Sequence, residues 1–93
     1  MPFSFDLSDE LKAAIRALAK KDPKTVEIIN KKIKQVINSD ETAVDHYKNL
    51  RYDQKEYKRA HIAKSFVLMF KVFKKEKFIL FDKFEHHDRA YKR

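Results

Sequence analysis

Three consecutive runs of alternating apolar residues constrain the fold of this chain more than any other feature of its sequence. The runs cover Glu56–Ile62, Ser65–Phe73 and Lys77–Glu85, and only two or three residues separate each run from the next. A period of two is typical of β-strands, and such short separations favour hairpin connections between antiparallel neighbours. The sequence therefore predicts a three-stranded antiparallel meander in the C-terminal part of the chain.

A short strand and two helices are predicted before the meander. Apolar residues alternate with polar ones between Phe3 and Leu7, and Ser8 is then a suitable N-cap for a helix with acidic residues in its first turn. Asp22-Pro23 starts a second helix directly after the first, since proline is favoured at the first helical position. Each helix carries one apolar stripe, made of Leu11, Ala14, Ile15 and Leu18 in the first and of Val26, Ile29, Ile33, Val36 and Ile37 in the second.

The remaining segments are polar. Asn38-Ser39-Asp40 ends the second helix, and the stretch to about Gln54 is predicted to be a long loop with a little helix. Residues 86–93 form a basic tail with room for a final helical turn. The expected fold is α+β: an N-terminal strand and a helical hairpin packed on an antiparallel sheet of about four strands, in one domain over residues 1–93.

Composition excludes several classes of protein. The chain has no cysteine and no glycine, so it has no thiolate metal cluster, no thiol nucleophile, no P-loop and no glycine-rich dinucleotide turn. No cofactor is expected. The longest apolar run lies within Phe66–Phe70, far shorter than a membrane span, and no signal peptide is evident. We expect a soluble cytoplasmic protein.

The positive charge is concentrated in the second half of the chain. The formal net charge is +8. Residues 1–54 hold ten basic and nine acidic side chains, whereas residues 55–93 hold twelve basic and five acidic ones. Arginine, lysine, histidine and tyrosine are interleaved around the predicted strands, which favours a phosphate-rich partner such as RNA.

Three segments resemble one known family in their order and spacing. They are HYKNLRYDQKEYKRAHI before and within the first strand of the meander, HIAKSFVLMFKV across the first hairpin, and the terminal EHHDRAYKR. Together they are similar to the RelE/ParE toxin superfamily, and to its RelE-like branch in particular. The resemblance covers essentially the whole chain. It implies the toxin of a toxin–antitoxin pair, which cuts messenger RNA in the ribosomal A site, with a helical RelB-like antitoxin and the 70S ribosome as partners.

Metal-independent RNA cleavage needs groups that this sequence can supply. The 2′-hydroxyl must lose a proton, the phosphorane must be neutralised by cations, and the departing 5′-oxygen must gain a proton. Histidine suits either proton transfer, since its ordinary pKa of about 6.5 lies near the working pH. Arg59 and His61 are two residues apart on a strand and project from one face, and Glu85 and His87 are expected to do the same.

The resemblance assigns roles to individual residues. The catalytic candidates that it implies are Arg59, His61, His86, His87 and Tyr91. Lys58, Lys64, Arg89 and Lys92 are candidates for binding RNA phosphates. The chain departs from the family pattern at two positions, with Ala63 at a hairpin glycine and Val67 at a basic residue of the next strand.

Other interpretations remain open from the sequence. A ParE-like poison of DNA gyrase would not use His87 or Tyr91 chemically, and a non-catalytic RNA-binding or ribosome-binding domain would use the same cations for affinity alone. A zinc site at His86-His87 is disfavoured, because adjacent strand residues diverge and no third ligand is evident. His46 is predicted to be an ordinary surface histidine.

Overall fold

The structure is a computed structural model that describes residues 3–47 and 57–90 of the 93-residue chain. The elements, in chain order, are β1 (Ser4–Leu7), α1 (Asp9–Lys21), α2 (Pro23–Ile37), α3 (Glu41–Val44), β2 (Lys58–Ile62), β3 (Phe66–Phe73), β4 (Phe78–His86) and α4 (His87–Ala90). The predicted N-terminal strand, helical hairpin, meander and final helical turn are all present, with strand ends within two residues of those expected.

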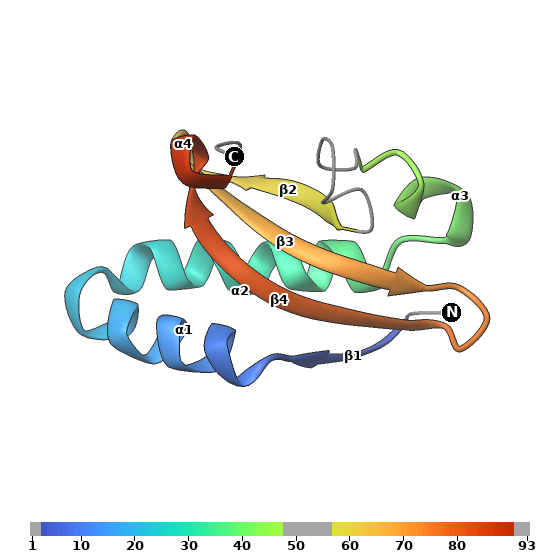
Figure 1. Cartoon of the computed structure of the whole chain (residues 1–93), viewed down its shortest axis with the longest axis horizontal. Coiled ribbons are helices and arrows are strands. Elements are labelled where there is room, and N and C mark those ends of the chain that lie inside the picture. Colours follow the sequence, from blue (N-terminus) through green and yellow to red (C-terminus); the bar gives the residue numbers. More distant parts are fainter. Residues whose placement is uncertain (1–2, 48–56, 91–93) are drawn as a thin grey trace.

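The four strands form one sheet in the order β1-β4-β3-β2 (Figure 1). Pairing is antiparallel between β2 and β3 and between β3 and β4, as predicted, but β1 pairs with β4 in parallel. The sheet is therefore mixed, and the expectation of a wholly antiparallel sheet was wrong in this respect. The helical hairpin explains the difference. Because α2 runs back along α1, the chain enters the meander near the start of β1 (Figure 1). Strands β2 and β4 then run in the same direction as β1.

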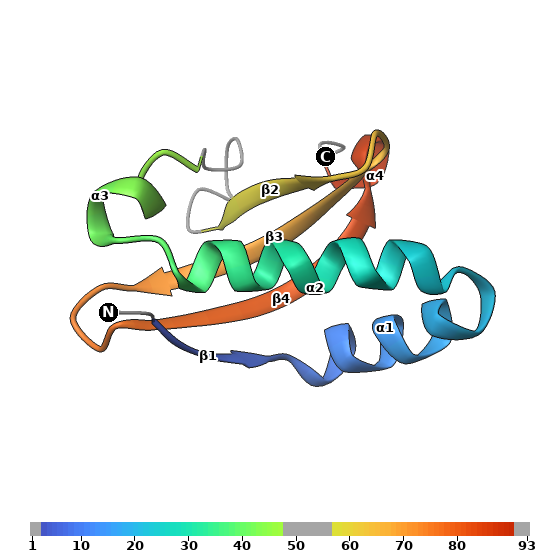
Figure 2. The same ribbon diagram turned by 180° about the vertical axis from the view of Figure 1, so that it is seen from behind.

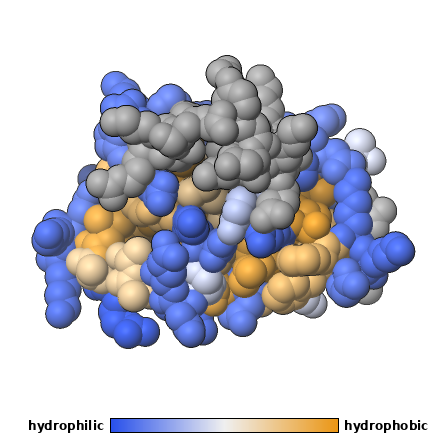
Figure 3. All heavy atoms as spheres, in the orientation of Figure 1, coloured by the Kyte–Doolittle hydropathy of each residue, from blue (hydrophilic) through white to orange (hydrophobic). Residues whose placement is uncertain are grey.

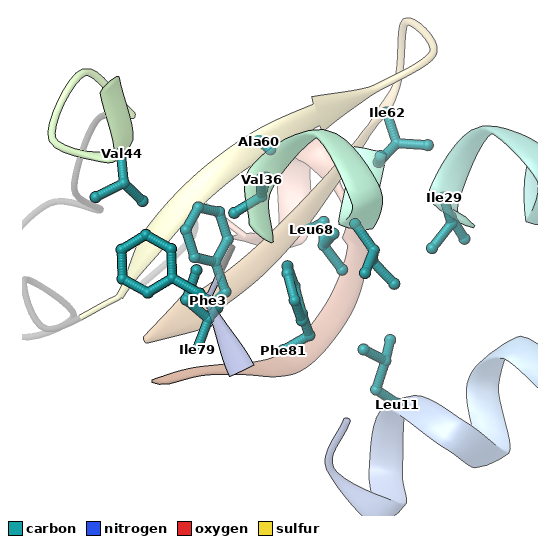
Figure 4. Packing of buried hydrophobic residues seen from close by; sticks show 12 residues of the cluster. Phe3, Leu11, Ile29, Val36, Val44, Ala60, Ile62, Leu68, Ile79 and Phe81 are labelled. Atoms are coloured by element: carbon teal, nitrogen blue, oxygen red, sulfur yellow. The ribbon is translucent and has the colours of Figure 1, made fainter. Parts of the chain in front are cut away.

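One face of the sheet packs against α1 and α2 (Figure 2). This helix face carries alternate residues of β3, among them Leu68 and Phe70, and their partners on the neighbouring strands. The apolar stripes of both helices cover these residues, because burial of an amphipathic helix on a sheet removes both apolar surfaces from water. Figure 4 shows the resulting cluster, whose buried members are Phe3, Leu11, Ile29, Ile33, Val36, Val44, Ala60, Ile62, Leu68, Phe70, Ile79 and Phe81.

Ser8 ties the first helix to the sheet. Its hydroxyl accepts a hydrogen bond from the Leu11 N–H at 3.0 Å, which is the predicted N-cap, and donates one to the Asp82 carbonyl at 2.6 Å. Asp82 lies in β4, where the pairing with β3 shifts between Met69 and Phe70. One side chain thus caps α1 and fixes it to β4 at an irregularity of the sheet.

Both turns of the meander place a residue other than glycine in the left-handed region. Ala63 has φ 54° and Lys77 has φ 51°. This conformation costs an ordinary residue roughly 1–2 kcal/mol, which is why glycine is usual there. Ala63, at the hairpin position where the family pattern has a glycine, thus adopts a backbone conformation that favours glycine. Of the helices that the structure describes, none is long and apolar enough to span a membrane.

Candidate active site

The candidate site lies on the face of the sheet that is turned away from α1 and α2. This outer face carries Arg59 and His61 from β2, Val67 and Met69 from β3, and Lys83 and Glu85 from β4. The register places these residues in two rows across the strands, His61–Val67–Glu85 and Arg59–Met69–Lys83. In each row a buried apolar residue separates two ionisable ones. The ionisable side chains of β2 and β4 therefore lie on either side of a buried apolar strip of β3.

Figure 3, in the orientation of Figure 1, shows hydrophilic side chains interspersed among hydrophobic ones on the visible part of this side of the molecule. Further along the face, the Tyr57 hydroxyl donates a hydrogen bond to the Asp82 carboxylate at 2.5 Å. The ammonium group of Lys71 lies 4.8 Å from the centre of the Tyr57 ring. These contacts join the residue directly before β2 to β3 and β4, beside the two rows.

The imidazole rings of His61 and His87 stack on each other. Their ring centres are 6.0 Å apart and the angle between their planes is 20°. The backbone explains why the two residues meet: the His87 N–H donates a 2.6 Å hydrogen bond to the carbonyl of Ser65, in the turn between β2 and β3. The start of α4 is thereby held against the end of β2, and His87 is brought to the outer face beside His61.

The surroundings of His61 lower its pKa below the ordinary histidine value. The largest cause is partial desolvation of the ring, followed by the positive charges of Arg59, His87 and Lys32. Both effects disfavour the imidazolium form. His61 is therefore mainly neutral near pH 7, which is the form that can accept a proton from a substrate hydroxyl.

A pocket of about 410 Å³ opens next to His61. Its walls come from three parts of the fold: Lys32 from α2, His46 and Tyr47 after α3, and Arg59, Ala60 and His61 from β2. Tyr47 is fixed twice, because its ring packs edge-on against Phe70 at 5.6 Å and its carbonyl accepts a 3.1 Å hydrogen bond from Lys58. The pocket thus has an anchored wall and several cationic or protonatable side chains.

Three candidates from the sequence lie away from the stacked histidines. His86 pairs with Phe66 on the helix face and packs edge-on against its ring, with the ring centres 5.5 Å apart. Lys58 lies on the same side and donates to Tyr47. Lys64 lies in the exposed turn between β2 and β3. Of the catalytic candidates that the structure describes, it therefore brings together Arg59, His61 and His87.

Tyr91 and Lys92 lie outside the described residues, and for Arg89 the structure describes only the backbone, within α4. Their predicted roles stay predictions. Asp88 is close to both C-terminal histidines, since its carboxylate oxygens lie 3.9 Å from His86 Nδ1 and 4.0 Å from His87 Nδ1. These distances are too long for hydrogen bonds, and the exposed carboxylate contributes little to the position of either ring.

Sequence reasoning missed three residues near the site. Lys32 is one of several lysines on α2, and only the packing of α2 beside β2 shows that it reaches the pocket. His46 is exposed, as expected of a surface histidine, yet it lines the same pocket. Lys83 could have been found from the period of two in β4, had the register with Met69 been known.

No group of three histidine, cysteine, aspartate or glutamate side chains that could hold a metal ion occurs within residues 3–47 and 57–90. The adjacent histidines lie on opposite faces of the sheet, His86 against Phe66 and His87 against His61.

Comparisons with solved structures support the fold. The crystal structure of YafQ from E. coli strain BL21(DE3) superposes with a TM-score of 0.73 at 20% identity, over 97% of this chain and 99% of that one. The toxin–antitoxin complex RelBE2 from Mycobacterium tuberculosis contains a chain that superposes with a TM-score of 0.71 at 12% identity, over 94% of this chain and 93% of that one. At these identities the likeness shows a shared fold.

Comparisons of sequence show the family. No family model matches the chain. An uncharacterized protein of Methanosarcina mazei is 33% identical over 85 residues, which are 91% of this chain and 94% of that protein. A protein of Methanocaldococcus jannaschii named "Putative toxin RelE4" is 36% identical over 91 residues, which are 98% of this chain and 93% of that protein. With a relative this similar over nearly its whole length, and with the matching fold, the chain belongs to the RelE family of toxins.

Proposed function

We propose that this protein is a ribosome-dependent endoribonuclease that cuts messenger RNA in the A site. The stacked pair of His61 and His87 beside Arg59 carries the proposal. Two imidazoles on one face can each move one proton, and both transfers are needed when a 2′-hydroxyl attacks the adjacent phosphorus. Membership of the RelE family and the +8 net charge agree with an RNA substrate.

The proposed reaction gives each residue of the site a task. Neutral His61 accepts the proton of the 2′-hydroxyl while the 2′-oxygen bonds to phosphorus. The bond from phosphorus to the 5′-oxygen then breaks, and protonated His87 donates a proton to that oxygen. The products are a 2′,3′-cyclic phosphate and a free 5′-hydroxyl. Arg59 and Lys83, in the neighbouring row of the outer face, would supply positive charge for the phosphorane.

The proposed partners are the ribosome and an antitoxin. The ribosome would hold the message against the outer face, because two histidines and a few cations are too few groups to orient a flexible RNA alone. A RelB-like antitoxin of helical structure would cover the same face. The similar chain from Mycobacterium tuberculosis comes from a toxin–antitoxin complex, which agrees with this proposal.

Primer extension on a defined message in programmed 70S ribosomes tests the proposed function. We expect the wild-type protein to cut only at the A-site codon, and His61→Ala and His87→Ala to lose this activity. His86→Ala is the matched control, since His86 is the same residue type adjacent to His87 but on the helix face. Thermal unfolding of each variant checks that the fold is intact.

Two outcomes would refute the proposal. An intact message with wild-type protein would do so, and a DNA gyrase supercoiling assay would then decide whether the protein acts as a gyrase poison. Equal activity of wild type, His61→Ala and His87→Ala would show that the cutting does not depend on the stacked pair.

A further inference from the structure

We infer that the pocket at the edge of β2 binds a phosphate group of the RNA that lies against the two-histidine site, with Lys32 of the helix layer as its principal ligand. The pocket lies at the outer edge of the sheet, since β2 is the last strand in the order β1-β4-β3-β2. The identification of the anion as RNA rests on the proposed function. The capacity of the pocket to bind a phosphate is independent of that function.

The lining of the pocket favours an anion. Lys32, His46, Arg59 and His61 contribute cationic or protonatable groups from α2, from the segment after α3 and from β2. The described residues that line the pocket include no carboxylate. Lys32 and Arg59 bring permanent positive charge to the pocket from two separate elements, and such charge attracts a phosphate.

Lys32 differs from the other lysines of α2 in its surroundings. It is half-buried, whereas its neighbour Lys31 is exposed. The charge of Lys32 is also one of those that lower the pKa of His61, so the two side chains are close enough to interact. A lysine that only solvated the surface would extend into water, whereas Lys32 lines a pocket at the edge of the sheet.

The pocket is continuous with the proposed catalytic pair. His61 lines the pocket on one side and stacks on His87 on the other, with the ring centres 6.0 Å apart. An RNA backbone whose reacting phosphate lies at the pair can therefore place a neighbouring phosphate in the pocket. Lys32 would then be a substrate-binding residue that positions the strand, while His61 and His87 move protons.

The pocket size suits one phosphate with part of its nucleotide. About 410 Å³ lies toward the lower end of the range for small-ligand pockets. Tyr47 forms the anchored wall, through the T-shaped contact of its ring with Phe70. Because the charged groups of the lining act on the phosphate, we expect binding to depend on the phosphate more than on the base.

Titration of amide resonances with adenosine 5′-monophosphate, followed by heteronuclear NMR, tests this inference. We expect shifts centred on Lys32, His46 and Arg59–His61, with adenosine alone producing none of them. Lys32→Met keeps much of the alkyl stem, and it should weaken binding about tenfold, because a charge-assisted contact is lost. Lys32→Arg should restore most of the affinity, and Lys31→Met is the matched control that should bind like wild type.

The outcomes separate this inference from the proposed nuclease activity. Equal binding by wild type and Lys32→Met, or equal weakening by Lys31→Met, would overturn the inference even if the ribosome assay shows cleavage. Binding that depends on Lys32, found together with an intact message in the ribosome assay, would support the pocket and refute the nuclease. Where cleavage is seen, Lys32→Met should raise KM more than it lowers kcat, since the residue binds the strand and transfers no proton.

Discussion

The two faces of strand β3 differ in what lies across from them on the neighbouring strands. On the helix face, Leu68 and Phe70 lie among the apolar residues of the cluster beneath α1 and α2. On the outer face, Val67 and Met69 are equally buried, yet their partners on β2 are His61 and Arg59. The same strand therefore supplies a continuous core on one side and a rigid apolar support for ionisable side chains on the other.

This difference separates stability from activity in space. Residues on the helix face are surrounded by apolar groups from several elements, so the loss of one leaves a cavity. His61 and His87 are exposed on the outer face, and surface side chains such as these can be replaced with little effect on folding. The comparison predicts that substitutions on the two faces have distinct consequences.

The largest effect is expected for Phe70→Ala on the helix face. Phe70 is fully buried and contacts Phe81 and Tyr47, so we expect a loss of about 3–5 kcal/mol in the free energy of unfolding. Phe73→Ala on the same strand is the control, since Phe73 is 41% exposed. Denaturant unfolding followed by circular dichroism measures both, and similar losses for the two variants would contradict the contrast between the faces.

His87→Ala is expected to have the converse effect on the outer face. Removal of one proton-transfer group lowers a rate about 10²–10⁴-fold. The free energy of unfolding should change little, because His87 is exposed and its backbone hydrogen bond to Ser65 does not need the side chain. Single-turnover cleavage on programmed ribosomes and denaturant unfolding test the two halves of this prediction. A variant that is inactive only because it is unfolded would count against it.

Most of the fold could be predicted from the sequence because its signals are local. The period of two in the meander, the N-cap at Ser8 and the Asp22-Pro23 helix start each depend on a few neighbouring residues, and all are confirmed. The parallel pairing of β1 with β4 was missed, because it depends on the direction in which the helical hairpin returns the chain.

The candidate site was predictable only in part. The shared face of Arg59 and His61 follows from their spacing, and the contact with His87 is consistent with the family motif. Lys32 and His46 could not be found in this way, since their approach to β2 depends on how α2 and the segment after α3 pack on the sheet. The left-handed backbone of Ala63 could not be predicted from its residue type, since this conformation favours glycine.

A smaller effect on stability is expected at Ser8, which joins α1 to strand β4 of the sheet. Its hydroxyl caps α1 and also holds the carbonyl of Asp82 in β4, so Ser8→Ala should lower the free energy of unfolding by about 1–2 kcal/mol. Ser4→Ala, at an exposed position of β1, is the control. Thermal unfolding compares them, and equal melting temperatures would show that the cap does not stabilise the junction.

The smallest effect is the contribution of His61 to the pH dependence of the free energy of unfolding. Desolvation first, and then the charges of Arg59, His87 and Lys32, lower the pKa of His61 in the folded protein, whereas the unfolded chain keeps a value of about 6.5. Between these two values the unfolded chain binds more protons, so stability rises with pH through this window and is lost on acidification. The exposure of the ring keeps the effect small.

An NMR titration of the His61 ring should have its midpoint below 6.5, and thermal unfolding of His61→Gln should depend less on pH in that window. A midpoint above 6.5 would mean that nearby acidic groups outweigh desolvation and the cations, and the sign of this pH dependence would then be reversed.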